Sequence, residues 1–302
     1  MIFHSFFIGD EKMRKRLIYR CDDVGMSETY DIGIFKVIED NIGCSADVMF
    51  DAEHAVEALR KLKEKPWLSI GWHRHLWGRP VLPAKEVPSM VNDEGRFKWG
   101  HDVKMCGVGV EYEEAYREFK AEMQLCYYAI GKYPDVAPCD PENDLPMEKA
   151  FCDVVREYNI ASNYFSLSDD FHGRKKNYLD PKYEHLHIVS ASIATGHMYD
   201  MNYWDEYQPI EAMTRLQWTD KEEIYFYGWH PGFVDDMILS ESSCNIHRVR
   251  ENIHARSKEY KDWIISNHIE LINFRDALYG TNEYQDHLKK IDSPLWIGNM
   301  KG

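Results

Sequence analysis

The stretch RLIYRCDDVGMSETYDIG, residues 16–33, joins an apolar run to two adjacent carboxylates, a glycine and a serine. Residues 17–21 have the character of a buried strand. Asp22 and Asp23 follow at its end, where a nearby cation would offset the repulsion between their charges. An acidic turn between strand and helix is the alternative explanation. Ser27 predicts a helix start, because its hydroxyl can accept a hydrogen bond from a backbone N–H of the first turn.

Short β-rich runs and longer amphipathic segments alternate along the rest of the chain. Further strands are expected over residues 45–50, 68–73, 136–139, 160–164, 185–189, 224–229 and 269–273. Helices are expected from Ser27 to Gly43, after a cap at Asp51, and over residues 112–130, 147–158 and 248–265. Seven or eight such βα units predict an α/β fold, an irregular TIM-barrel-like barrel of mostly parallel strands. We expect residues 1–15 to form an N-terminal extension and residues 16–302 a single domain.

The composition restricts the partners of the protein. Its 302 residues include 36 basic and 51 acidic side chains, a net charge of -15, which argues against nucleic acid binding. The 7 cysteines are scattered and contain no CxxC pair, as expected of a reduced, cytoplasmic protein without a thiolate zinc site. No apolar stretch approaches the roughly 18 residues of a membrane span, so no membrane partner is expected. A homodimer is compatible with this composition.

Polar side chains follow four of the expected strands, at the barrel end where active sites lie. They are Asp22 and Asp23, His73 and His75, Asp140 and Glu142, and His230. Oxygen and nitrogen donors from separate strands at one rim predict a metal site. His73 and His75 have strand spacing, so one can be a ligand and the other a contact to a ligand or to substrate. The Pro-Gly after His230 fixes its direction and suits a general acid.

Four segments resemble the YdjC-like carbohydrate deacetylases, in the order in which that family carries them. They are IYRCDDVGMSETYDIGI, GWHRHLWGRPVLP, VPSMVNDEGRF and WHPG, and they lie between residues 16 and 273. The resemblance implies an irregular barrel of parallel strands and one divalent metal ion. It also implies hydrolysis of the N-acetyl group of an acetylated amino sugar.

By position, the resemblance makes Asp22 the base, Asp23 and His73 metal ligands, and His230 the acid. The segment YPDVAPCDPENDLP departs from the family, which carries an Asp-x-His-x-His run there. Asp140 falls at the position of the third ligand, with Glu142 as the alternative donor. Two carboxylates and one imidazole favour Mg or Mn over Zn, although all three ions stay candidates.

The substrate contacts follow from the same segments. Trp77 and Arg79 lie in the segment after the third strand, and sugar rings rest their C–H faces on aromatic planes. His75 and Glu142 are the other expected contacts to a small carbohydrate. Two alternatives to a carbohydrate deacetylase remain: a metal-dependent hydrolase of another amide or ester, and a catalytically silent sugar-binding barrel.

Overall fold

The computed structural model describes residues 14–74, 76–99, 105–167, 179–191, 200, 202, 205–218 and 223–300, so His75 lies outside the described residues. Within them, every strand pairing in the sheet is parallel. The strands are β1 (Lys15–Val24), β2 (Ser45–Val48), β3 (Ser69–Trp72), β4 (Ser166–Leu167), β5 (Ile188–Ser190), β6 (Ile224–Trp229) and β7 (Ile269–Leu271). The predicted α/β class with parallel strands is confirmed.

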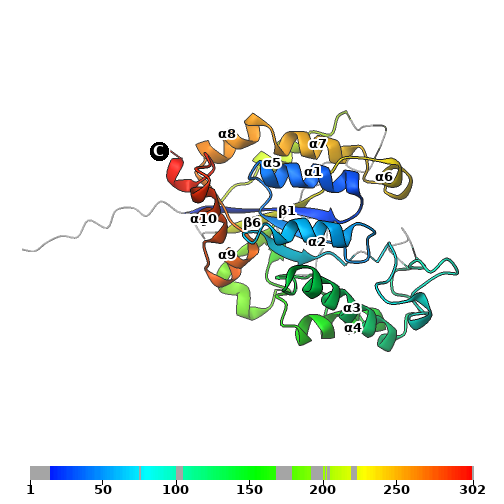
Figure 1. Ribbon diagram of the computed structural model, residues 1–302. Coiled ribbons are helices and arrows are strands. Elements are labelled where there is room, and N and C mark those ends of the chain that lie inside the picture. Colours follow the sequence, from blue (N-terminus) through cyan, green and yellow to red (C-terminus); the bar gives the residue numbers. More distant parts are fainter. Residues whose placement is uncertain are drawn as a thin grey trace, which may run out of the picture.

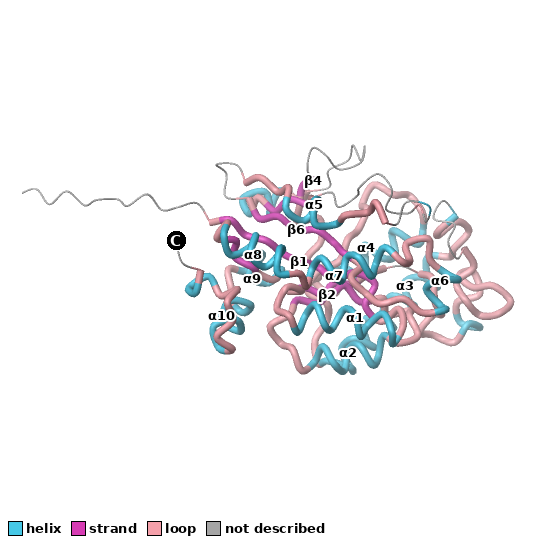
Figure 2. The backbone as a smooth tube through the Cα atoms, turned by 90° about the horizontal axis from the view of Figure 1, so that it is seen from above, coloured by secondary structure: helices cyan, strands magenta, loops and turns pink. Residues whose placement is uncertain are grey.

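The strand order describes an irregular barrel. Neighbouring strands follow the order β3-β2-β1-β6-β5-β4. Single parallel bridges join Gly71 of β3 to Val136, and Val136 to Ala161. Ala161 lies shortly before β4 in the chain, so these bridges lead from β3 toward the β4 edge of the sheet, and Figure 2 shows helices around the strands. β7 pairs with the beginning of β1 and stays outside this series.

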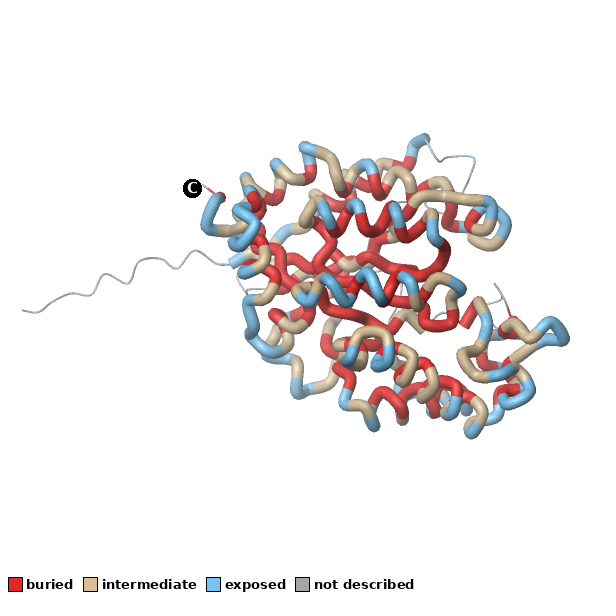
Figure 3. The backbone as a smooth tube through the Cα atoms, viewed as in Figure 1, coloured by how far each residue is buried: buried red, intermediate tan, exposed pale blue. Residues whose placement is uncertain are grey.

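Helices surround the strands on several sides (Figure 1). They are α1 (Glu28–Glu39), α2 (Ala55–Lys63), α3 (Tyr112–Ile130), α4 (Pro146–Glu157), α5 (Pro209–Thr214), α6 (Asp236–Glu241), α7 (His247–Ala255), α8 (Lys258–Ser266), α9 (Phe274–Tyr279) and α10 (Glu283–Lys290). Short 3-10 segments cover Ala84–Glu86, Pro181–Leu186 and Ile297–Asn299. The strands are buried and the helices expose their outer faces, as amphipathic helices around an apolar core do (Figure 3). No helix in the described part of the chain has the length and apolarity to cross a membrane.

Capping residues explain where the helix predictions succeed and fail. Ser27 caps α1 as predicted, its hydroxyl accepting the backbone N–H of Tyr30 at 3.2 Å. Asp51 does not cap α2, which begins after His54, because the Asp51 carboxylate accepts backbone N–H groups of the segment after β3 instead. The helix predicted over residues 248–265 is two helices, since Ser257 caps a new one.

Several of the predicted strands are shorter than expected, and two that fall in described parts of the chain are absent. Residues 136–139 and 160–164 contribute only single bridges, at Val136 and Ala161, and the strand of the second segment, β4, lies at Ser166–Leu167 instead. Within residues 185–189, His187 has a left-handed backbone (φ 50°) at the end of a 3-10 turn, so β5 begins only at Ile188. Period-2 patterns cannot reveal such a turn, because it depends on backbone geometry at one residue.

Candidate active site

Buried charged side chains gather where β1, β2, β3 and β6 end. Asp22 and Asp23 are each 5% exposed, and His73 and His230 come directly after β3 and β6. Adjacent strand residues normally point to opposite faces of a sheet. Here the register of β1 against β2 shifts between Cys21 and Val24, and Asp23 has a left-handed backbone (φ 59°). This irregularity lets both aspartates take part in one network of ionic contacts.

Both oxygens of Asp23 contact nitrogen donors. Oδ1 lies 2.9 Å from His73 Nε2, and Oδ2 accepts a hydrogen bond from Arg248 Nη1 at 2.8 Å. Burial alone would raise the pKa of Asp23, but the Arg248 guanidinium and the hydrogen bond with His73 hold it well below its usual range. Burial lowers the pKa of His73, yet the hydrogen bond with Asp23 raises it overall to about 9.

Arg20 holds Asp22 in a two-point contact. Its Nε and Nη2 donate to the two Asp22 carboxylate oxygens at 2.6 and 2.9 Å. The same Nε lies 3.3 Å from Oδ2 of Asp47, which in turn lies 3.9 Å from His73 Nδ1. Bidentate contacts of this kind fix the direction of a carboxylate. Arg20 therefore links the two carboxylates Asp22 and Asp47 into the same cluster as His73.

Asp47 belongs to the site and was missed by the sequence analysis. It is 1% exposed on β2, and its Oδ1 is buried without a hydrogen-bond partner. Burial raises its pKa to about 6, although Arg20 opposes this. A Cβ at Gly71 would meet Asp47 Oδ1 at 1.7 Å, and a Cβ at Gly228 would meet Asp22 Oδ2 at 2.1 Å. A charged residue within the apolar run of β2 was the available signal.

His230 lies against helix α7. Its backbone N–H donates to Glu251 Oε2 at 2.5 Å, and the hydroxyl of Tyr207 donates to Glu251 Oε1 at 2.8 Å. Burial lowers the pKa of His230 to about 4, so the imidazole is neutral at neutral pH. Burial raises the pKa of Glu251 to about 7, although these hydrogen bonds oppose the rise. Arg248 and Glu251 were not predicted as site residues, although their i, i+3 spacing places both on one helix face.

The donors present fit two ligands of a divalent ion. Asp23 Oδ1 and His73 Nε2 lie 2.9 Å apart, so a carboxylate oxygen and an imidazole nitrogen, both common ligands of divalent ions, stand side by side. Asp47 faces the other ring nitrogen of His73, as a carboxylate that orients a ligating histidine does. In the ranges described above, no three His, Cys, Asp or Glu side chains form a group that could hold a metal ion.

Asp140 and Glu142 lie in the segment that leads into α4. The backbone N–H of Asp140 donates to Glu148 Oε1 at 3.0 Å, and Asp140 Oδ1 accepts the backbone N–H of Glu142 at 3.1 Å. Asp140 lines a cavity of 310 Å³ beside α4, together with Tyr112 and Lys149.

Trp77 and Arg79 line one cavity, as substrate contacts would. This cavity of 440 Å³ is also lined by Met26, Met49 and Met237, from segments that follow β1, β2 and β6. Its volume lies within the roughly 300–1,000 Å³ typical of small-molecule sites. Arg79 donates to the carbonyl oxygen of Glu94 at 2.7 Å, which fixes its guanidinium at the rim.

The fold and the site define a barrel of parallel strands with a carboxylate–imidazole centre at the carboxyl ends of the strands. The chain belongs to the YdjC-like protein family, whose model matches residues 16–266, so the family resemblance of the sequence motifs is confirmed.

Relatives and a solved structure agree with this membership. A carbohydrate deacetylase of Clostridium beijerinckii is 28% identical over 267 residues, which cover 86% of this chain and 99% of the relative. A carbohydrate deacetylase of Brevibacillus brevis is 26% identical over 268 residues, with coverage of 86% and 99%. The crystal structure of a candidate cellobiose-phosphate cleavage protein from Enterococcus faecalis superposes with a TM-score of 0.65. It is 23% identical, covers 87% of this chain and 98% of its own, and supports the TIM-like fold.

Proposed function

We propose that this protein is a carbohydrate deacetylase that removes the N-acetyl group from an acetylated amino sugar or oligosaccharide. The observation that carries the proposal is the contact of Asp23 with His73 beside the Arg20-bound Asp22, at the carboxyl ends of the strands. Membership of the YdjC-like family and the relatives named carbohydrate deacetylases support the same activity.

Asp23 and His73 would hold one divalent ion, with Mg, Mn and Zn as the candidates. Bound there, such an ion supplies Lewis-acid polarisation of the acetamide carbonyl. We propose Asp140 as the third ligand, with Glu142 as its alternative. The support for this is chemical, since a carboxylate replaces an imidazole as a donor to a hard cation.

Asp22 and His230 would move protons. Hydrolysis breaks an O–H bond of water and the C–N bond of the amide, and it forms a C–O bond and an N–H bond on the leaving amine. We assign Asp22 to accept the proton of the attacking water, in the orientation that Arg20 imposes. His230 then delivers a proton to the amine. Because burial keeps the imidazole neutral at neutral pH, the proton that Asp22 takes from the water would pass to His230 before it reaches the amine.

Trp77 and Arg79 would contact the sugar from their shared cavity, with the methionine side chains against its C–H faces. His75 and Glu142 are proposed as further contacts. We also propose that the protein works in the cytoplasm, because its cysteine pattern is that of reduced proteins. We further propose that it forms a homodimer.

An acetate-release assay combined with metal analysis tests the proposal. The full chain would be incubated with N-acetylglucosamine, its β-1,4-linked oligomers and simple N-acetyl amides, after its metal content is measured. Acetate release from the sugars and bound metal support a deacetylase, whereas release from the simple amides alone indicates a different amide hydrolase. A protein that binds sugar but neither binds metal nor releases acetate is the silent sugar-binding barrel.

A further inference from the structure

Helix α7 forms one wall of the site and holds three separate segments of it. Arg248 contacts Asp23, and Glu251 accepts the backbone N–H of His230. Asn252 Nδ2 donates to the carbonyl oxygens of Pro231 at 2.6 Å and of Gly33 at 2.8 Å. These side chains stand at positions i, i+3 and i+4, so they share one face of the helix. Helix α7 therefore ties the end of β1, the segment after β6 and helix α1 together.

We propose that Glu251 is the positioning residue of His230, which sets both the place of its backbone and the orientation of its imidazole ring. The inference rests on the proposed function for the role of His230, but the contacts that carry it do not. Glu251 is fully buried (0% exposed), and its two oxygens face two different partners. Oε1 is held by the Tyr207 hydroxyl, which leaves Oε2 aimed at His230.

The imidazole ring of His230 also faces Glu251. Its Nδ1 is buried without a hydrogen-bond partner and lies 3.8 Å from Glu251 Oε2. A buried polar nitrogen without a partner is costly, and hydrogen bonds of catalytic groups tighten when substrate binds. A small rotation of the ring brings Nδ1–H onto Oε2. With Nδ1 protonated, Nε2 carries the lone pair that can take up a proton and return it to the leaving amine.

Substitutions of Glu251 test this role through activity. Glu251→Ala should lower kcat about 10- to 100-fold with little change in KM, the usual scale for a residue that orients another. Glu251→Gln should recover most of the loss, because its amide oxygen can still accept both N–H groups of His230. Asp276→Asn is the matched control: Asp276 is also buried and accepts backbone N–H groups, but at the opposite end of the sheet. Its kcat should stay that of the wild type.

The tautomer of His230 tests the same role without any turnover. In protein labelled with ¹⁵N-histidine, the His230 signals are those lost in His230→Gln. We expect the Nδ1–H tautomer in the wild type and in Glu251→Gln, and a shift to Nε2–H in Glu251→Ala. Thermal unfolding of each variant establishes that the protein is folded under the assay conditions.

The two measurements separate the possible failures. A wild-type protein that releases no acetate from any sugar defeats the proposed function, while the tautomer still decides whether Glu251 orients His230. A Glu251→Ala protein with kcat within about two-fold of the wild type overturns the positioning role. An unchanged tautomer in that variant overturns it as well.

Discussion

Two ionic networks lie at opposite ends of the same sheet, and they satisfy their charges in different ways. In Figure 1, α9 and α10 lie where β1 begins, while α6 lies where β1 ends. The network at the beginning of the strands is built around Arg275, and the network at their end is built around Asp23. We call them the amino-end and the carboxyl-end network.

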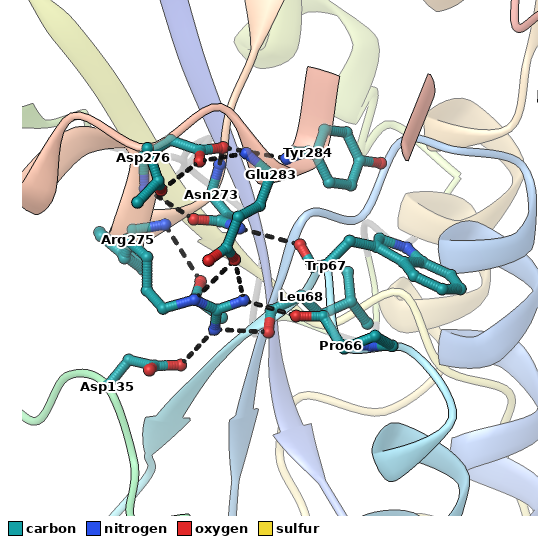
Figure 4. Close-up of polar contacts among 12 residues, drawn as sticks. Pro66, Trp67, Leu68, Asp135, Asn273, Arg275, Asp276, Glu283 and Tyr284 are labelled. Atoms are coloured by element: carbon teal, nitrogen blue, oxygen red, sulfur yellow. Dashed lines mark hydrogen bonds and ion pairs between the residues drawn. The ribbon is translucent and has the colours of Figure 1, made fainter. Parts of the chain in front are cut away.

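In the amino-end network, charged groups bind mostly to the backbone (Figure 4). The Arg275 guanidinium donates to the carbonyl oxygens of Pro66 and Leu68 and pairs with Asp135 and Glu283. Asp276 accepts the backbone N–H groups of Asn273, Glu283 and Tyr284. Charges that satisfy backbone groups in this way tie segments together, so this network is a structural clamp.

In the carboxyl-end network, charged groups bind mostly to one another across elements. Asp23 pairs with His73 and Arg248, and Arg20 lies between Asp22 and Asp47. Asp47 Oδ1 and His230 Nδ1 remain buried without a partner. Buried groups left unsatisfied cost stability and are typical of functional sites. Substitutions at the carboxyl end should therefore change activity most, and substitutions at the amino end should change stability most.

The largest expected effect is the loss of function on removing Asp23 or His73. Asp23→Ala and His73→Ala should abolish metal retention and acetate release, because each removes one of two adjacent donors. Metal analysis and the acetate assay measure both. Asp23→Asn keeps the size of the side chain and serves where the alanine variant does not fold. Full metal occupancy in Asp23→Ala and His73→Ala would contradict the ligand assignment.

At the amino end, Arg275→Ala should lower the free energy of unfolding by about 3 kcal/mol. It leaves Asp135 without its guanidinium partner and two carbonyl oxygens without a donor. Urea unfolding measures the loss, and kcat of the folded protein should not change. A fall in kcat with unchanged stability would contradict the structural role of the amino-end network.

Removing the proposed proton carriers should have the next largest effect. Asp22→Asn and His230→Gln should keep the metal but lower kcat about 100-fold, the usual scale for a general base or acid. Metal analysis is the control, because these side chains are not proposed as ligands. If either variant turns over saturating substrate near the wild-type rate, another residue carries that proton.

The smallest expected effect is a pH dependence of stability that originates at the carboxyl end. Burial raises the pKa of Glu251 to about 7, so between about pH 4.5 and 7 the native state binds more protons than the unfolded state. The free energy of unfolding should therefore fall as the pH rises through this window, by about 1 kcal/mol per pH unit. Urea unfolding of Glu251→Gln should lack this part of the slope. An identical slope in both proteins would show that Glu251 titrates normally.

The sequence by itself determined the fold class and which polar residues lie at the strand ends. The alternation of strands and helices predicted parallel strands, and the polar residues at the end of β1 and after β3 and β6 were located without coordinates. These inferences hold because apolar periodicity and strand-end position are local properties of a chain. The motifs in their order also identified the family, since each lies within one short segment.

Only the tertiary structure decided what surrounds those residues. Arg248 and Glu251 reach Asp23 and His230 from a helix that follows β6, more than two hundred residues after Asp23 in the case of Arg248. The left-handed backbone at Asp23 and the burial of Asp47 beside Arg20 depend on strands packed side by side. Contacts between distant segments arise only when the chain has folded, and so do the pKa values that these contacts set. No local sequence pattern therefore predicts them.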